Sequence, residues 1–147
     1  SMPVAWGNLT AAGLRSLEVL HRTYFTTMYG GRDIAQRYAS GTLAKVLEAL
    51  SDPNPAVPLE VLVGHDTNLE GVKSLLGLEW QCGPWSEDAL TPLAGLLFTL
   101  SDGGVHIRLV CPTFAEPPLA IGTARFRDGS SEMPVAAFRS LVTPAIA

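Results

Sequence analysis

The sequence predicts an α/β fold in a single unit of 147 residues, and three observations carry this prediction. Two long segments near the N-terminus space their apolar residues three or four positions apart, which is typical of amphipathic helices. A short apolar run at residues 59–63 is followed at once by another helical pattern. Two β-rich runs then flank a Gly-Gly turn, which indicates a hairpin. We therefore expect a partial sheet with flanking helices and a β-hairpin.

Two helices are expected before residue 52. Thr10 is a residue type that caps helices, and the first helix should run from there to about Gly30. Its apolar face comprises Leu14, Leu17, Leu20, Tyr24 and Phe25. The second helix should begin near Asp33, which we interpret as its cap, and should end at the Asp-Pro-Asn-Pro stretch of residues 52–55. Its apolar stripe comprises Ile34, Tyr38, Leu43, Val46, Leu47 and Leu50.

Residues 59–63, Leu-Glu-Val-Leu-Val, are almost continuously apolar. Such a run predicts a strand that is covered on both faces inside an α/β sheet. Helical spacing resumes directly afterwards, so we expect Thr67 or Asn68 to cap a helix that begins at once. Strand, tight turn and helix N-terminus therefore meet at His65 and Asp66.

The second half of the chain is predicted to be mainly β-structure. A polar loop from about residue 80 to 92 leads into the hairpin of residues 96–100 and 105–111. One more strand is expected near residues 123–126, and a short helix near residues 135–142. The three tryptophans of the chain are most simply anchors of the core or of loops, and they are Trp6, Trp80 and Trp85.

Composition excludes several classes of function. The formal net charge is −4 with scattered basic residues, which argues against a nucleic-acid partner. No apolar segment is long enough to predict a membrane span. The N-terminus has no signal-peptide pattern, and Ser1-Met2 is typical of the scar of a cleaved tag. Cys82 and Cys111 fit no metal spacing and could form one disulfide or none.

The chemistry of interest lies at the predicted end of the strand. Ligands of open α/β sheets gather at the carboxyl ends of strands, where helix N-termini favour anions. There an imidazole at His65 could donate to a phosphate oxygen, and a shielded Asp66 could give a proton to a departing alkoxide. The alternative is a packing histidine beside a turn carboxylate, which is the commoner role of an arbitrary His-Asp pair.

Residues 64–69, Gly-His-Asp-Thr-Asn-Leu, resemble the GHDTN(L/I) signature of the histidine acid phosphatases, in the branch of bacterial phytases and glucose-1-phosphatases. Residues 5–10 resemble the Gly-Trp-Gly segment of that branch, and residues 20–25 resemble its Leu-His-Asn-Ala-Gln-Phe helix. Residues 92–96 resemble its Pro-Gly-Gly-Glu-Leu stretch, with two departures, and residues 133–147 resemble its C-terminal helix and tail. The likeness covers nearly the whole chain but only the C-terminal third or so of the family's sequence.

The resemblance implies the C-terminal part of the histidine acid phosphatase fold and a role for each motif residue. In that family a histidine of an RHGxRxP motif takes the phosphoryl group, and the aspartate of the HD pair protonates the leaving alcohol. Asp66 would then be the proton donor and His65 a phosphate ligand. Thr67, Asn68 and His21 would contact substrate, although a histidine on an amphipathic helix is more often a packing or surface residue. The resemblance implies no metal or other cofactor, a phosphorylated small molecule or inorganic phosphate as partner, and a periplasmic or secreted location.

One departure from the family is severe. The 147 residues contain no Arg-His-Gly, and the only histidines are His21, His65 and His106. A covalent mechanism needs a nucleophile, so we expect the chain alone to be inactive. The alternatives are a non-catalytic remnant that binds phosphate, and one half of a split enzyme that assembles with the missing N-terminal portion or as a homodimer. Within a single fragment, residues 1–52 would lean towards the family's helical subdomain, and residues 53–147 towards its sheet domain.

Overall fold

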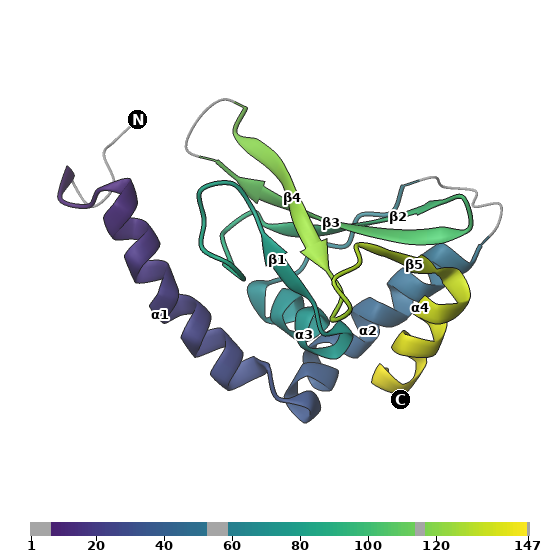
Figure 1. Ribbon diagram of the computed structural model, residues 1–147. Helices are drawn as coiled ribbons and strands as arrows, with labels where there is room; N and C mark the ends of the chain where they lie inside the picture. The colour runs from purple at the N-terminus through teal and green to yellow at the C-terminus, as the bar shows by residue number, and fades with distance from the viewer. Residues whose placement is uncertain (1–6, 53–58, 114–116, 147) are drawn as a thin grey trace.

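The computed structural model describes residues 7–52, 59–113 and 117–146 as a mixed α/β structure (Figure 1). Three helices, α1, α2 and α3, precede the described strands, and α4 follows them. The elements in chain order are α1 (Ala11–Tyr29), α2 (Arg32–Ser51), α3 (Asp66–Leu76), β1 (Glu79–Gln81), β2 (Gly95–Ser101), β3 (Gly104–Pro112), β4 (Leu119–Arg125), β5 (Glu132–Pro134), α4 (Val135–Val142) and a 3₁₀ turn at Thr143–Ala145. None of the helices in these ranges has the length and apolar character to cross a membrane.

The described strands form one sheet in the order β1-β4-β3-β2, with β5 pairing to β3, and every pairing is antiparallel. The predicted hairpin is confirmed as β2 and β3. Its turn lies at Asp102 and Gly103, whose φ angles of 50° and 75° are the left-handed values of a tight type I′ turn. The predicted strand near residues 123–126 is the end of β4, and the short helix is α4.

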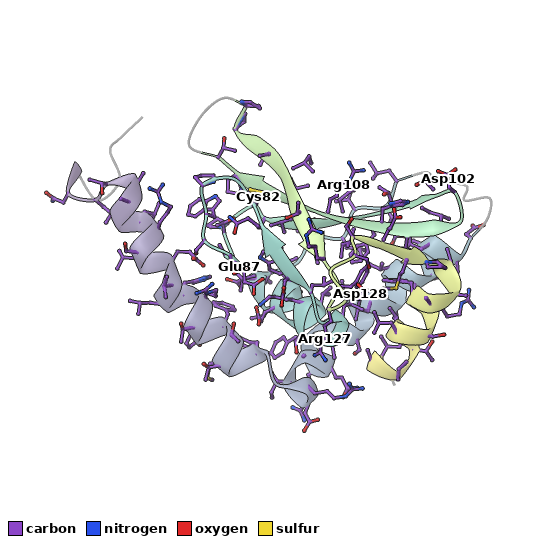
Figure 2. All side chains as sticks on the ribbon, in the orientation of Figure 1. Cys82, Glu87, Asp102, Arg108, Arg127 and Asp128 are labelled. Atoms are coloured by element: carbon purple, nitrogen blue, oxygen red, sulfur yellow. A yellow bond between two sulfur atoms is a disulfide. The ribbon has the colours of Figure 1, made fainter. Side chains whose placement is uncertain are left out.

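The core lies between one face of the sheet and the helices α2, α3 and α4 (Figure 1). Alternate residues of β3 point into it: Ile107 is fully buried, whereas Arg108 is exposed on the other face (Figure 2). Phe138 of α4 packs on Phe98 of β2, with ring centroids 5.9 Å apart. A Cβ at Gly71 would lie 2.7 Å from that of Ala39, so a glycine is needed where α3 approaches α2.

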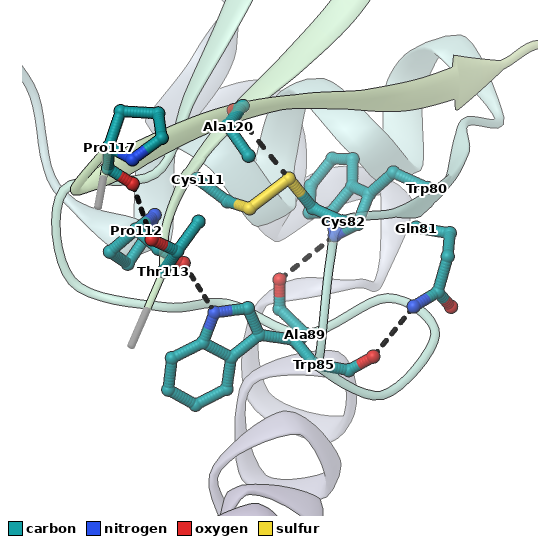
Figure 3. The surroundings of a disulfide bond; sticks show 10 residues. All are labelled: Trp80, Gln81, Cys82, Trp85, Ala89, Cys111, Pro112, Thr113, Pro117 and Ala120. Carbon is teal, nitrogen blue, oxygen red and sulfur yellow. Dashed lines mark hydrogen bonds between the residues drawn. A yellow bond between two sulfur atoms is a disulfide. The ribbon is translucent and has the colours of Figure 1, made fainter. Parts of the chain in front are cut away.

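A disulfide between Cys82 and Cys111 joins the chain after β1 to β3, with 6.2 Å between the Cα atoms (Figure 3). The two tryptophans nearby anchor the intervening loop. The indole of Trp80 donates to the Ala89 carbonyl at 3.0 Å, and that of Trp85 donates to the Pro112 carbonyl at 2.7 Å. Their predicted role as anchors is confirmed, while Trp6 lies outside the described residues.

Helix α1 is confirmed, and the Thr10 hydroxyl caps it by accepting from the amide of Gly13 at 3.1 Å. Its predicted apolar face is largely exposed: Phe25 is buried, but Leu20 is 68% exposed. Figure 1 shows why, because α1 runs along one side of the molecule with only part of its surface against the other elements. Helix α2 is also confirmed, although Asp33 lies in its first turn and is not the cap, which is Gly31.

The predicted strand at residues 59–63 is wrong for this structure. The segment belongs to no strand, and its side chains are not covered: Val61 is 72% and Val63 96% exposed. Its apolar character fits a buried strand, but the described part of the chain supplies no neighbour for it. The helix that follows begins at Asp66 with His65 as the cap, so the predicted caps Thr67 and Asn68 lie inside its first turn. The three-residue strands β1 and β5 were not predicted.

Candidate active site at the start of α3

The backbone of His65 is held in place by Asn68. The side-chain Oδ1 of Asn68 accepts from the His65 amide at 2.9 Å, and its Nδ2 donates to the Tyr38 carbonyl of α2 at 2.6 Å. The His65 carbonyl in turn accepts from the Asn68 amide at 3.0 Å. A Cβ at Gly64 would lie 2.9 Å from the Asn68 Oδ1, so the glycine leaves room for this cap. The turn before α3 is thus anchored on α2.

Asp66 is the first residue of α3, where the positive end of the helix dipole favours a carboxylate. Its Oδ1 accepts from the amide of Thr67 at 2.9 Å. Its Oδ2 lies 3.6 Å from Nε2 of His21, which is an electrostatic contact longer than a normal hydrogen bond. The side chains of His21 and Asp66 are 41% and 42% exposed, so a solute can reach both.

Two amides of the first turn are therefore not free to bind an anion in this conformation. The Thr67 amide is occupied by the Asp66 carboxylate, and the Asn68 amide by the His65 carbonyl. An anion that uses the Thr67 amide has to displace the Asp66 side chain. Anion binding and the position of this carboxyl group are thus linked.

Helix α1 brings His21 to the motif across the fold. The imidazole stacks on the buried ring of Phe25, with 4.5 Å between centroids. Arg22 donates to the carbonyl of Glu87, and the Ser86 hydroxyl donates to the Glu18 carboxylate. Both contacts tie α1 to the loop before β2. The structure thus places His21 beside Asp66, and both are residues that the resemblance marks for the site.

An aromatic group beside the motif was missed by the sequence analysis. Tyr29 at the end of α1 lies 5.3 Å from the rings of both Phe25 and Tyr38, measured between centroids. The pKa of Tyr29 is raised, first by its hydrogen bond with Tyr24 and by that phenol's electrostatic effect, and in smaller part by the Asp66 carboxylate. These rings link α1 and α2 next to Asp66. Their helical spacing in the sequence signalled packing only.

Glu70, one turn after Asp66, is a second feature that the sequence did not reveal. Its side chain is buried, and within the described part of the chain its Oε2 has no hydrogen-bond partner. Burial raises the pKa of Glu70, while the nearby Lys73 opposes the shift. Lys73 itself pairs with Asp88 at 3.1 Å. Burial between α1 and α3 therefore disfavours the charged form of the Glu70 side chain.

Thr67 is the remaining residue that the resemblance marks for the site, and His106 and Arg32 take part in contacts elsewhere. The Thr67 side chain is partly buried on the first turn of α3. His106 pairs with Glu132 at 2.9 Å across β3 and β5, and so takes part in a sheet contact. Arg32 donates to the Pro144 carbonyl at 2.9 Å. No three His, Cys, Asp or Glu side chains gather as metal ligands in the ranges that the structure describes.

Comparison with known proteins shows which fold the chain has. No protein-family model and no curated protein sequence matches the chain. Among solved structures, the phytase from Citrobacter braakii superimposes with a TM-score of 0.76 at 22% identity, over 98% of this chain and 44% of that chain. Hafnia alvei phytase in complex with myo-inositol hexakis sulphate superimposes with a TM-score of 0.73 at 21% identity, over 97% and 43%. The same phytase in complex with tartrate superimposes with a TM-score of 0.72 at 24% identity, over 98% of this chain and 43% of that chain.

The chain therefore has the fold of part of a bacterial phytase, as the resemblance of its motifs implied. It spans less than half the length of these phytases, a share that is somewhat larger than the third expected from the sequence. The extent of the match is consistent with the C-terminal portion that the sequence led us to expect.

Proposed function

We propose that the chain is the C-terminal portion of a phytase-like histidine acid phosphatase that hydrolyses phosphomonoesters. The observation that supports this most is the accessible His65-Asp66 pair at the start of a helix, in a chain with part of the phytase fold. The substrate is a phosphorylated small molecule, and inorganic phosphate is the product. Residues 1–52 belong to a helical subdomain and residues 53–147 to the sheet domain.

The proposed reaction has two steps. A histidine nitrogen supplied from outside these 147 residues bonds to phosphorus while the bond to the alcohol oxygen breaks, and the Asp66 carboxyl group gives its proton to that departing oxygen. Water then takes the phosphoryl group from the phosphohistidine, which releases inorganic phosphate. The reaction needs no metal or other cofactor.

The other residues of the site bind and orient the substrate. The His65 imidazole donates to a phosphate oxygen. The Thr67 amide becomes available when the Asp66 carboxyl leaves it, and Asn68 retains a second amide hydrogen beyond the one given to Tyr38. His21 lies close enough to Asp66 for both to contact one substrate.

The missing nucleophile leads to a prediction for the isolated chain. No Arg-His-Gly occurs in the sequence, so the pure 147-residue polypeptide should show little or no phosphatase activity. Turnover by this polypeptide that disappears with Asp66→Ala would overturn this prediction.

The disulfide supports a periplasmic or secreted location, because such bonds persist in oxidising compartments.

A single-chain chimera tests the proposal. Residues 7–146 replace the matched part of the Citrobacter braakii phytase, and hydrolysis of inositol hexakisphosphate is measured. We expect activity that Asp66→Ala lowers about 10²- to 10⁴-fold in kcat, because a general acid contributes about that much. Ser140→Ala on the exposed face of α4 is the control and should leave activity unchanged. A folded chimera whose activity does not depend on Asp66 would contradict the role of this residue.

The alternative is a non-catalytic phosphate-binding remnant, and the absence of Arg-His-Gly is the observation that favours it. It predicts that the isolated chain binds inorganic phosphate and that His65→Ala abolishes this binding. A folded but inactive chimera together with such binding would favour the remnant over the phosphatase. No binding at millimolar phosphate would exclude the remnant.

A further inference from the structure

A series of aromatic rings begins at the contact between His21 and Asp66 and continues from α1 to α2. The His21 imidazole, whose Nε2 lies 3.6 Å from the Asp66 carboxylate, stacks on the ring of Phe25 with 4.5 Å between centroids. Tyr29 follows, with its ring centroid 5.3 Å from that of Phe25 and 5.3 Å from that of Tyr38. The rings therefore form one connected surface that starts at the proposed proton donor.

Three tyrosines make up the accessible part of this surface, and we call Tyr24, Tyr29 and Tyr38 the tyrosine cluster. Tyr24 and Tyr38 are 52% and 45% exposed, and Tyr29 between them is partly buried. Tyr29 meets both of the other rings edge to face, at interplanar angles of 74° and 90°. Because this is a preferred packing geometry for aromatic rings, the cluster holds its exposed rings in defined orientations.

The tyrosine cluster is fixed relative to the motif at the start of α3. The side chain of Asn68, which caps the His65 amide, donates to the backbone carbonyl of Tyr38 at 2.6 Å. The pKa of Tyr29 is raised mainly by its hydrogen bond with Tyr24, and the Asp66 carboxylate adds to the shift. All of these contacts lie within α1, α2 and α3, so the arrangement does not arise from the limited span of the chain.

Three basic side chains of the same helices are engaged away from the cluster. Arg22 and Arg32 donate to backbone carbonyls of the loop before β2 and of the 3₁₀ turn, and Lys73 pairs with Asp88 at 3.1 Å. The charged group beside the cluster is instead the carboxylate of Asp66. Further phosphate groups on a leaving alcohol would thus gain no counter-charge from these three cations, whereas an aromatic ring would gain contacts with the tyrosines.

We infer that Tyr24, Tyr29 and Tyr38 form a subsite for the leaving group, and that this subsite favours the aromatic alcohol of an aryl phosphate over a polyphosphorylated alcohol. The inference rests on the proposed function, because it places the phosphoryl group of the same molecule at His65 and Asp66. The tyrosines bind and orient the aryl ring and take no part in proton transfer.

The first test uses the 147-residue chain and two probes with the same head group, phenyl phosphate and methyl phosphate. Dissociation constants and the shifts of the tyrosine ring resonances are measured by NMR titration. We expect phenyl phosphate to bind at least about threefold more tightly, because each aromatic pair is favourable beyond the area that it buries. The ring resonances of Tyr24 and Tyr38 should shift with phenyl phosphate and stay in place with methyl phosphate.

Variants show whether the rings cause this preference. Tyr38→Leu and Tyr24→Leu each remove an exposed ring, and the first keeps the backbone carbonyl that Asn68 uses. Each should lower the preference for phenyl phosphate at least about twofold and leave methyl phosphate binding unchanged. Tyr38→Phe keeps the ring and should keep the preference, as should the control Ile121→Ala at an exposed position of β4. An equal loss with Tyr38→Phe and Tyr38→Leu would contradict the role of the ring.

The chimera separates this inference from the proposed function. There Tyr38→Leu should raise KM for phenyl phosphate with little change in kcat, because the ring contributes binding that is equal in the ground state and the transition state. KM for inositol hexakisphosphate should stay unchanged. A phenyl preference in a chimera without turnover would support the subsite and reject the proposed function. Turnover with no effect of either Tyr→Leu substitution on KM for phenyl phosphate would reject the subsite and leave the proposed function standing.

Two results with the 147-residue chain overturn the inference outright. One is equal binding of phenyl phosphate and methyl phosphate. The other is a preference for phenyl phosphate that survives both Tyr24→Leu and Tyr38→Leu, which would place the aryl ring elsewhere on the molecule.

Discussion

Two regions of the molecule carry similar apolar patterns and have opposite surroundings. The sheet with α2, α3 and α4 encloses its apolar residues, and Phe138 is fully buried. Helix α1 and residues 59–64 present theirs to solvent, as at Leu20 and Val63. An apolar pattern in the sequence therefore indicates that a segment needs other residues to pack against. The described part of this chain supplies them in only one of the two regions.

The candidate site lies where these two regions join. Asp66 begins a helix of the core, and His21 reaches it from α1. The loop contacts of Arg22 and Glu18 hold α1 near the core despite its exposed stripe. The site is thus positioned by the core and left open on the side where the exposed region lies.

The largest effect should come from the core. Phe138→Ala removes a fully buried ring and should lower the free energy of unfolding by about 3–5 kcal/mol, measured by urea denaturation of the isolated chain. Leu20→Ala on the exposed stripe is the comparison and should change it by less than about 0.5 kcal/mol. Equal losses at both positions would remove the distinction between the regions.

The disulfide should come next. Cys82→Ser opens a loop of 29 residues' separation and should cost about 3 kcal/mol, which a reductant should reproduce in the unsubstituted chain. Unfolding curves with and without reductant provide the measurement. If reduction leaves the unfolding midpoint unchanged, the bridge does not hold β3 to the chain after β1.

A smaller effect on stability is expected at the turn before α3, where the two regions join. Asn68→Ala removes the bonds to the His65 amide and the Tyr38 carbonyl and should cost about 1–2 kcal/mol. Ser140→Ala on the exposed face of α4 is the control and should stay within about 0.5 kcal/mol. Thermal unfolding of both variants decides whether the cap anchors the turn.

The smallest effect depends on pH. Because burial raises the pKa of Glu70 above its ordinary 4.5, the folded chain keeps this proton at pH values where the unfolded chain has released it, and stability falls as pH rises through that window. Glu70→Gln removes this fall, so the stability of the variant relative to the original should grow with pH above 4.5. Urea unfolding over a pH series measures it, with exposed Glu60→Gln as control. A constant difference would show that Glu70 does not resist ionisation.

Local features of the structure could be predicted from the sequence, and long-range ones could not. The α1 cap at Thr10, the hairpin turn and the placement of His65 and Asp66 at a helix start depend on neighbouring residues. The exposure of residues 59–63 depends on strands that the described chain does not supply. The sequence likewise could not tell whether the two cysteines pair, and β1 and β5 are too short to leave a pattern.

The contact between His21 and Asp66 depends on both local and long-range features. Each residue was marked by the resemblance of its own segment, but only the packing of α1 on the core shows that the two side chains meet. Tyr29 and Glu70 were missed for the same reason, since the first packs between α1 and α2 and the second is buried between α1 and α3.

The central claim is that Asp66 protonates the leaving group, and the dependence on the leaving group tests it most directly. In the active chimera, Asp66→Asn should lower kcat for an alkyl phosphate about 10²- to 10⁴-fold, because an alkoxide leaves poorly without a proton. For p-nitrophenyl phosphate, whose phenolate leaves readily, the loss should be much smaller. Equal losses for both substrates would contradict the account, because Asp66 would then act on binding or structure and not as the acid.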